Sequence, residues 1–338
     1  MRSCLGIVLC LLFLFGCESS QKEITLGFYH WKQRADLDSL GLARFNQLHS
    51  EDIYYRIFDI SMEGNQILPV SNCQIDTNIT ANKNIYACVF IRNKAIKSLR
   101  SQREIQDLAS KIIQKFNRDF IALYPSISWK GLQIDCDWDI QSKEGYFDLL
   151  ENLRSSLKPT LELSSTLRLH QYKYPNKTGV PPVERVALMC YNMGDIKKES
   201  ESNSIFQPQI LESYIRNVPS YPLPLDLALP LFEWNLIYRD AELYKIINHL
   251  SLDEKWDQLG PNKYRLKEDS YQGGHYLYKG DILRVERIDK DQLIQGVKKI
   301  QNHLESPPQK LIFYPLDQRS LERYETTFLK QVLQMINT

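Results

Sequence analysis

Polar and apolar side chains alternate over residues 131–139, whose sequence is Gly-Leu-Gln-Ile-Asp-Cys-Asp-Trp-Asp. In a β-strand, successive side chains point to opposite faces, so Gln133, Asp135, Asp137 and Asp139 would share one face. Carboxylates packed this closely are costly to remove from water, and their like charges raise the pKa of at least one of them. The row therefore predicts acid–base chemistry or ligand binding. The alternative is a structural cluster neutralised by Lys or Arg.

The other predicted strands end in side chains that could act together with this row. In an α/β barrel the carboxyl ends of all strands meet at one rim, where the chemistry takes place. The aromatic, basic, amide and acidic residues at these ends are His30, Trp31, Lys32, Arg56, Asp59, Arg168, His170, Gln171, Tyr191, Asn192, Glu233, Trp234, Tyr314 and Asp317. Aromatic rings pack against the C–H faces of sugars and carboxylates act on glycosidic bonds, so this combination predicts a carbohydrate site.

Glu233 is the residue of this set that is hardest to explain by packing, because it follows the apolar run 227–232. We expect it in the site. We expect substrate contacts from the aromatic, basic and amide residues Trp31, His30, Arg168, His170, Gln171, Asn192 and Trp234. The structural alternatives are a buried histidine for His170, core packing for the two tryptophans, counter-ions of the aspartates for Arg56 and Arg168, and a strand end for Tyr191.

Strand and helix patterns alternate along most of the chain. Strands are predicted at residues 24–31, 53–60, 85–91, 131–138, 161–170, 185–191, 225–232 and 311–314. Helices are predicted at residues 36–48, 103–124, 146–157, 210–218, 241–250 and 320–336. Eight strands with intervening helices predict an α/β fold of the (β/α)8 TIM-barrel type. The alternative, an open doubly wound sheet, would want a glycine-rich turn after its first strand, and none is present.

Residues 256–289 interrupt this alternation between the seventh and eighth strands. Residues 271–278 and 281–288 have the pattern of two strands, and Lys279-Gly280 lies between them. We therefore predict a β-hairpin insertion, which would be either a wall or lid over the barrel mouth or a decoration without function.

The amino terminus has the pattern of a secretion signal. A positively charged start is followed by an apolar run over residues 4–15 and by Leu14-Phe15-Gly16-Cys17, which resembles a bacterial lipobox. The resemblance implies a signal peptide at residues 1–16 that is cleaved before Cys17, and lipid on Cys17 in the form of diacylglycerol on its sulfur and palmitate, with an uncleaved anchor as the alternative. Residues 17–23 would then be a tether, and residues 24–338 a single barrel domain. We expect the protein on a bacterial membrane, facing the periplasm or the cell exterior.

Charge and cysteine content limit the partners. Lys and Arg total 42 and Asp and Glu total 41, and loss of residues 1–16 removes one Arg and no acid. The remaining chain has no net charge, so no nucleic-acid partner is expected.

The cysteines do not have the pattern of a metal site. Cys73, Cys88, Cys136 and Cys190 lack the close spacing of a zinc site, and we expect buried free thiols, although a disulfide of Cys73 is possible. We expect no cofactor; the alternative is a metal ion on the aspartates and His170.

Two short segments carry a family resemblance. Residues 135–139 resemble the end of the fourth-strand motif Asp-x-x-Asp-x-Asp-x-Glu of glycoside hydrolase family 18, the chitinase and endo-N-acetylglucosaminidase family. Met189-Cys190-Tyr191-Asn192 is similar to its sixth-strand motif. Compared with the family, Leu132 stands in place of the first Asp and Asp139 in place of the catalytic Glu. The mature chain also resembles a group of bacterial lipoproteins, and that second resemblance implies no activity.

The family resemblance implies substrate-assisted hydrolysis of an N-acetylated glycan. Asp139 would protonate the leaving oxygen, Asp137 would orient the 2-acetamido group, Tyr191 would hydrogen-bond to its carbonyl, and Asp135 would share a proton with Asp137. The side chain of Asp139 is one methylene shorter than Glu. Since a misplacement of about 1 Å costs on the order of 100-fold in rate, this difference matters.

Two alternatives remain from the sequence. One is a retaining or inverting glycosidase that uses Asp139 and Glu233, whose separation would decide the stereochemistry. The other is a lipid-anchored glycan-binding or cell-envelope protein without catalytic activity.

Overall fold

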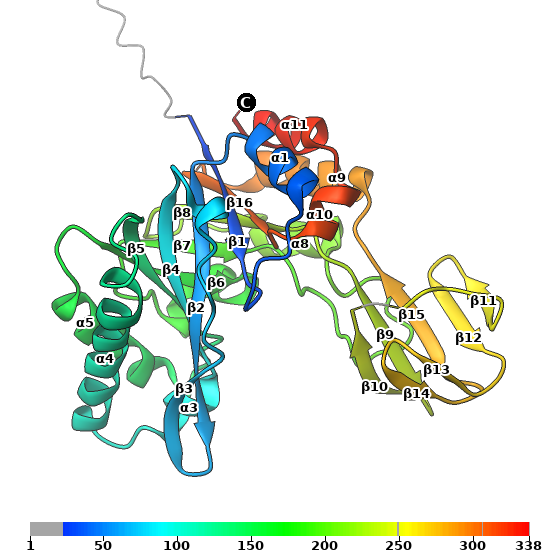
Figure 1. The fold of residues 1–338 in the computed structure, drawn as a ribbon, viewed down its shortest axis with the longest axis horizontal. Helices are drawn as coiled ribbons and strands as arrows, with labels where there is room; N and C mark the ends of the chain where they lie inside the picture. Colours follow the sequence, from blue (N-terminus) through cyan, green and yellow to red (C-terminus); the bar gives the residue numbers. More distant parts are fainter. Residues whose placement is uncertain (1–22, 249, 306, 338) are drawn as a thin grey trace, which may run out of the picture.

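Eight parallel strands close into a barrel in the computed structural model, which describes residues 23–248, 250–305 and 307–337. The strands follow one another around the barrel in chain order, and β1 pairs with both β2 and β16, which closes the ring (Figure 1). They are β1 (Thr25–His30), β2 (Asp52–Glu63), β4 (Asn84–Ile91), β5 (Ser128–Asp135), β6 (Glu162–Arg168), β7 (Arg185–Met189), β8 (Leu225–Pro230) and β16 (Lys310–Tyr314). The predicted (β/α)8 barrel is confirmed.

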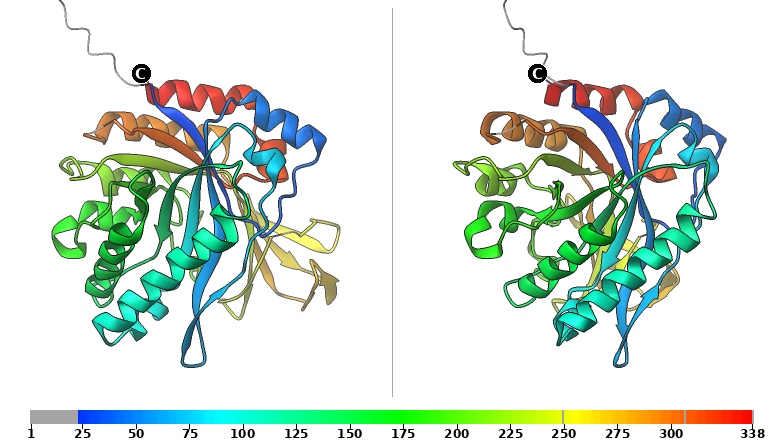
Figure 2. Two further views of the ribbon diagram at one scale, coloured as in Figure 1. Left: turned by 60° about the vertical axis from the view of Figure 1, so that its left-hand side comes forward. Right: turned by 90° about the vertical axis from the view of Figure 1, so that its left-hand side faces the viewer.

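Helices cover the outside of the barrel (Figure 2). They are α1 (Ser39–Gln47), α2 (Thr77–Thr80), α3 (Asn93–Ser98), α4 (Gln102–Phe116) with its π-helical continuation Asn117–Ile121, α5 (Lys143–Ser156), α6 (Leu169–Lys173), α7 (Pro175–Thr178), α8 (Pro208–Ile215), α9 (Lys290–His303), α10 (Gln318–Arg323) and α11 (Thr326–Asn337). In α4, the Oγ of Ser101 accepts a hydrogen bond from the amide of Glu104, and the buried side chains recur at helical spacing. That apolar face packs on the barrel.

The two faces of each barrel strand lie in different surroundings, one against the helices and one inside the barrel. On β1, Phe28 points outward, where its ring lies 5.5 Å from that of Phe45 on α1. Tyr29 points inward and packs with Tyr54 and Ile312 inside the barrel. The alternation of a strand therefore separates a helix-facing apolar layer from a barrel interior that is rich in tyrosine.

The amino-terminal end of the barrel contains buried charges. The Nζ of Lys310 lies 2.6 Å from Oδ2 of Asp52 and donates to the hydroxyl of Tyr86 at 2.7 Å. The Nη1 of Arg185 lies 3.2 Å from Oδ1 of Asp226, whose pKa burial raises to about 6. These pairs lie at the end of the barrel that usually serves stability.

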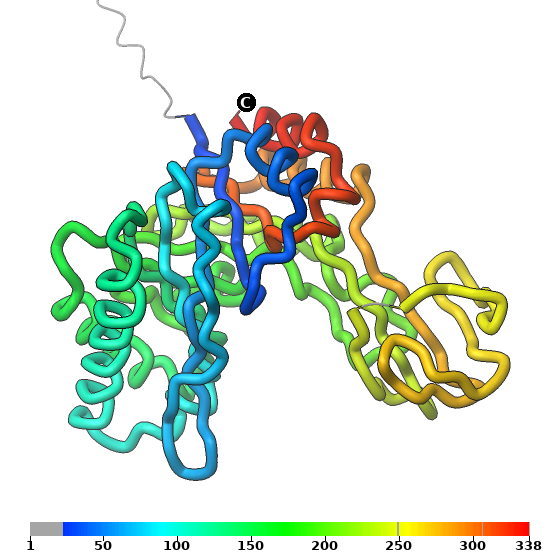
Figure 3. The backbone as a smooth tube through the Cα atoms, viewed as in Figure 1, coloured from blue at the N-terminus to red at the C-terminus, as the bar shows by residue number. Residues whose placement is uncertain are grey.

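The chain leaves the barrel after β8 and forms a separate antiparallel sheet before it returns through α9 (Figure 3). We call residues 234–286 the insertion. Its five-stranded sheet has the order β10-β9-β15-β12-β11, and a two-stranded hairpin lies beside it. The strands are β9 (Trp234–Arg239), β10 (Glu242–Ile247), β11 (Trp256–Gly260), β12 (Lys263–Leu266), β13 (Ser270–Gln272), β14 (His275–Leu277) and β15 (Ile282–Glu286).

Two details of the prediction are wrong in this region. The predicted helix 241–250 is the strand β10, because Asp240 and Ala241 both have positive φ and form a tight turn that reverses the chain onto β9. Segment 271–278 does not pair with 281–288. It folds on itself as β13 and β14 around Gly273 and Gly274, both at positive φ, while β15 pairs with β9 and β12.

A smaller hairpin extends from the barrel at β3 (Gln66–Val70), which pairs antiparallel with the end of β2.

Cys73, Cys88, Cys136 and Cys190 are buried free thiols, as expected. Within the described ranges, no helix is long and apolar enough to cross a membrane. The predicted signal peptide and the lipid site Cys17 lie outside the described residues, so those predictions stay untested.

Candidate functional site

A pocket of about 420 Å³ opens at the carboxyl ends of the barrel strands. Its lining residues are Tyr29, Trp31, Lys32, Asp135, Asp137, Thr166, Arg168, Met189, Tyr191, Asn192, Phe232, Glu233, Trp234, Asn248, Tyr314, Pro315, Asp317, Arg319, Ser320 and Arg323. Eight of the residues predicted for catalysis or substrate contact are therefore brought together here: Trp31, Asp135, Asp137, Arg168, Tyr191, Asn192, Glu233 and Trp234. The predicted strand-end residues Lys32, Tyr314 and Asp317 also line the pocket.

Asp135, the last residue of β5, forms part of the pocket floor. Burial raises its pKa to about 7; a hydrogen bond from Thr166 opposes the shift, and the charge of Asp137 adds to it. The Oγ1 of Thr166 donates to Oδ1 of Asp135 at 2.7 Å. A carboxyl group with a pKa near neutrality can hold or release a proton at physiological pH, which suits a role in acid–base chemistry.

Gln133 lies one layer deeper on the same face of β5. Its Oε1 accepts a hydrogen bond from the hydroxyl of Tyr29 at 2.6 Å, and its Nε2 donates to Ser164 at 3.3 Å. Burial raises the pKa of Tyr29 well above its ordinary value, so that hydroxyl remains a donor. These bonds hold the layer that supports Asp135.

Asp137 lies two residues beyond Asp135, and its side chain is half exposed in the pocket. Its Oδ2 lies 2.8 Å from Nη1 of Arg168, the last residue of β6. One carboxylate oxygen of Asp137 is thus held by a guanidinium, while the group as a whole faces open space in the pocket.

Aromatic rings form one wall of the pocket. The rings of Tyr191 and Tyr314 are stacked, with centroids 5.3 Å apart. Phe232 meets Tyr314 edge-on at 5.5 Å and Trp234 at 5.3 Å, and Trp31 lies 6.1 Å from Tyr314. Burial raises the pKa of Tyr191 well above its ordinary value, so its hydroxyl is a hydrogen-bond donor at any physiological pH.

Further charges lie in pairs around the rim. Glu233 forms an ion pair with Arg323 of α10. The Nζ of Lys32 lies 3.3 Å from Oδ2 of Asp317. The remaining basic residue of the lining, Arg319, donates to the carbonyl of Asn248 at 3.3 Å. The rim therefore presents acids and bases in roughly equal number.

Asp139, which the sequence predicts as the catalytic acid, lies outside the pocket. The strand β5 ends at Asp135, so the alternation that placed Asp139 on the same face stops before reaching it. Its Oδ1 accepts from the amides of Gln141 and Ser142, and its Oδ2 accepts from Asn93 at 3.1 Å and pairs with Lys97. Partial burial opposes ionisation, but these partners lower the pKa of Asp139 overall. The pocket therefore brings Glu233 into its lining without Asp139, and the predicted pair of these two acids does not meet there.

Three predicted substrate contacts lie outside the pocket. His30 points outward from β1 and stacks on Tyr55 at 4.3 Å, and burial lowers its pKa to about 4. His170 is exposed on the first turn of α6, where burial of part of the ring lowers its pKa. Gln171 is buried; it accepts from the amide of Arg168 and donates to the carbonyl of Trp138. His30 therefore lies on the outer face of a strand, and His170 and Gln171 lie on a helix.

Tyr29 and Thr166 line the pocket although they were not among the predicted site residues. The alternation could have found both, because Tyr29 shares a face with Trp31, and Thr166 shares one with Arg168. Arg323 could not have been found this way, since it reaches the site from a helix that follows the last strand. Among the described residues, no group of three His, Cys, Asp or Glu side chains could hold a metal ion, so the alternative of a metal on the aspartates and His170 finds no support.

Comparison with solved structures identifies chitinase-like barrels as similar folds. The C-terminal domain of a putative chitinase from Desulfitobacterium hafniense is 9% identical, with a TM-score of 0.54, over 93% of this chain and 99% of that one. A class V chitinase from Nicotiana tobaccum in complex with NAG4 is 12% identical, with a TM-score of 0.51, over 92% and 99%. The spore cortex-lytic enzyme of Bacillus cereus is 11% identical, with a TM-score of 0.52, over 94% and 75%.

No family model matches the sequence. No curated protein matches it either. At these identities the structural likeness shows the fold, and it confirms the chitinase-like barrel that the sequence indicated. The grouping with bacterial lipoproteins stays a prediction.

Proposed function

We propose that the pocket binds an N-acetylated glycan and hydrolyses it with the help of the substrate's own acetamido group. The observation that carries this proposal is that Asp135 and Asp137 line one open pocket together with the hydroxyl-bearing wall of Tyr191 and Tyr314. The chitinase-like fold supports it, because one neighbour of that fold has NAG4 bound.

The proposed acid is Asp137 rather than Asp139. If the motif Asp-x-x-Asp-x-Asp-x-Glu is aligned two residues earlier, Asp135 takes its last Asp and Asp137 its Glu. Gln133 then takes the second Asp, which agrees with its place in the layer below Asp135. The alignment still leaves the acid one methylene shorter than Glu.

In the proposed reaction, the acetamido oxygen of the substrate attacks the anomeric carbon while the glycosidic C–O bond breaks. Asp137 gives its proton to the leaving oxygen. Asp135 orients the acetamido N–H and stabilises the positive charge that develops on the acetamido group, and the hydroxyl of Tyr191 donates a hydrogen bond to the acetamido carbonyl, which holds it in position for the attack. Water then opens the cyclic intermediate and returns a proton to Asp137. The ion pair between Asp137 and Arg168 must open for this role when the sugar enters.

A second function, glycan binding without cleavage, is favoured by those ion pairs. Arg168 holds Asp137 and Arg323 holds Glu233, so each of these two acids of the pocket already has a cation. A protein that only binds sugars would keep the aromatic wall and would not need to release either acid.

The substitution Asp137→Asn separates the two functions, with Asp139→Asn as the matched control. For the full chain and chitooligosaccharides of several lengths, we expect Asp137→Asn to lower kcat by roughly 100-fold or more with little change in affinity. Asp139→Asn should retain turnover within about threefold, because its carboxylate lies outside the pocket. Equal turnover in Asp137→Asn and the unmodified chain would refute the mechanism. Binding without turnover in the unmodified chain would select the second function.

A further inference from the structure

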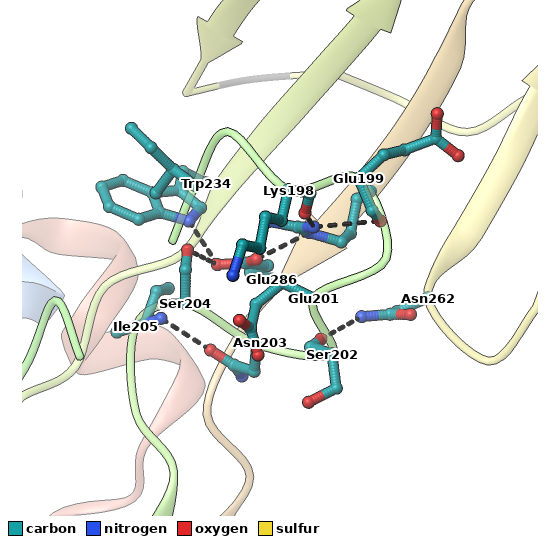
Figure 4. Close-up of polar contacts among 12 residues, drawn as sticks. Lys198, Glu199, Glu201, Ser202, Asn203, Ser204, Ile205, Trp234, Asn262 and Glu286 are labelled. Atoms are coloured by element: carbon teal, nitrogen blue, oxygen red, sulfur yellow. Dashed lines mark hydrogen bonds and ion pairs between the residues drawn. The ribbon is translucent and has the colours of Figure 1, made fainter. Parts of the chain in front are cut away.

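The insertion and the pocket share one side chain. Trp234 is the first residue of β9, and its ring lines the pocket. Its indole Nε1 donates to Oε2 of Glu286, the last residue of β15, at 2.7 Å (Figure 4). The edge of a ring that would contact the substrate is therefore bonded to a residue of the insertion.

The carboxylate that accepts this bond is fully buried and has further partners. The Oγ of Ser204 donates to the same Oε2 at 2.6 Å. The Nε of Arg284 lies 2.7 Å from the other oxygen, and both side chains of this ion pair are completely buried. A buried ion pair of this kind contributes little net stability compared with an apolar pair of similar size. A buried pair that adds little stability is better suited to holding the neighbouring side chains of the site in fixed positions.

The same network ties the loop after β7 to the insertion. Arg284 donates from Nη1 to the carbonyls of Lys198 and Glu199, the latter at 3.1 Å. The Nδ2 of Asn262 donates to the carbonyl of Ser202 at 2.9 Å (Figure 4). Glu286 is thus fixed from two sides, by its own sheet and by a loop that returns to the barrel.

The other side of Trp234 is held by the pocket wall. Its ring lies 5.3 Å from that of Phe232 at an interplanar angle of 67°. Phe232 in turn contacts Tyr191 at 6.0 Å and Tyr314 at 5.5 Å. The indole is therefore clamped between the aromatic wall and the buried carboxylate.

We propose that Glu286 is a positioning residue that holds the indole of Trp234 in orientation for sugar stacking, which makes the insertion a working wall of the binding site. This inference rests on the proposed function, because that function supplies the sugar that would stack on the indole of Trp234. It assigns the insertion a role in affinity, and no role in bond cleavage.

The test compares two double variants of the full chain that both lack the ion pair. Arg284→Met with Glu286→Leu removes the acceptor of the Trp234 bond. Arg284→Met with Glu286→Gln keeps an amide oxygen as acceptor. Trp256→Phe is the matched control, because Trp256 donates the same kind of bond to Gln272 at 2.9 Å and does not line the pocket. The probe is the N-acetylglucosamine tetramer.

The readouts are affinity, the split between KM and kcat, and the fluorine spectrum of protein labelled with 5-fluorotryptophan. The chain has five tryptophans, so Trp234→Phe assigns the resonance by its loss. We expect the Leu variant to shift this resonance and to weaken binding about 3- to 10-fold, with KM raised and kcat unchanged. The Gln variant and Trp256→Phe should stay within about twofold of the unmodified chain.

Identical resonances and affinities in the Leu and Gln variants would overturn the inference while leaving the proposed function intact. If the unmodified chain bound no oligosaccharide, the proposed function would fail, and with it the assigned role in affinity. Should both double variants fail to fold, hydrogen exchange at the indole of Trp234 in the unmodified chain decides the matter. Slow exchange supports the clamp, and exchange as fast as that of a free indole overturns it.

Discussion

Asp135 shows how the surroundings of a single residue set its chemistry. Burial at the pocket floor and the neighbouring charge of Asp137 raise its pKa, and the hydrogen bond from Thr166 lowers it, with a result of about 7. In an unfolded chain the pKa of an aspartate is about 3.9. Between these two values the folded state binds more protons than the unfolded state, so the free energy of unfolding falls as the pH rises.

This predicts that Asp135 contributes to the pH dependence of stability and that Asp135→Asn removes this contribution. From pH 4 to pH 7 we expect the unmodified chain to lose roughly 1–3 kcal/mol relative to Asp135→Asn, because an amide does not titrate and water reaches part of the carboxyl group. Urea unfolding of both proteins at several pH values measures the difference. A constant difference across this range would contradict the raised pKa.

At the scale of elements, the close approach of β5 and β6 determines where the acids emerge. A Cβ added at Gly131 on β5 would lie 2.4 Å from the carbonyl oxygen of Glu162 on β6, too close for any real contact. The glycine lets the two backbones pair as they do, with Gly131 opposite Glu162 and Ile134 opposite Ser165. Asp135 and Thr166 follow these residues directly, which explains how their side chains come within hydrogen-bond distance.

Gly131→Ala should therefore destabilise the protein, and Gly145→Ala should not. We expect a loss of about 1–3 kcal/mol at Gly131, since backbone must move to admit the methyl group. At Gly145 in α5 the new Cβ would lie 3.6 Å from Ile96, an ordinary contact, and the helix should gain roughly 0.5–1 kcal/mol. Denaturant unfolding compares the two, and equal effects would rule out the steric argument.

At the scale of the whole molecule, the barrel is closed by contacts between the two ends of the chain. Lys310 on β16 and Asp52 on β2 are 258 residues apart, and their buried side chains meet across β1 at 2.6 Å. The insertion is added to this closed ring between β8 and β16, and it reaches the pocket through Trp234. The molecule is thus a closed barrel with a separate sheet whose first residue, Trp234, lines the pocket.

Lys310→Met is expected to cost about 3–5 kcal/mol, because it leaves the carboxylate of Asp52 buried without its cation. Combining it with Asp52→Asn should recover part of that loss. Lys290→Met is the control, since its pair with Glu325 is largely exposed and such pairs contribute about 0–1 kcal/mol. Thermal or denaturant unfolding of the four proteins measures these effects. A loss at Lys310 no larger than that at Lys290 would show that the buried pair does not hold the ring closed.

The sequence by itself determined the barrel and the acidic row at its mouth, because both depend on local periodicity. Side chains alternate along a strand whatever the strand pairs with, so Asp135, Asp137 and the aromatic strand ends could be recognised together. The tertiary structure decided where the alternation of β5 stops, which placed Asp139 against Lys97. It also decided the ion pairs of the acids and the pairing inside the insertion. Those contacts join residues far apart in the chain, and no local pattern encodes their distance.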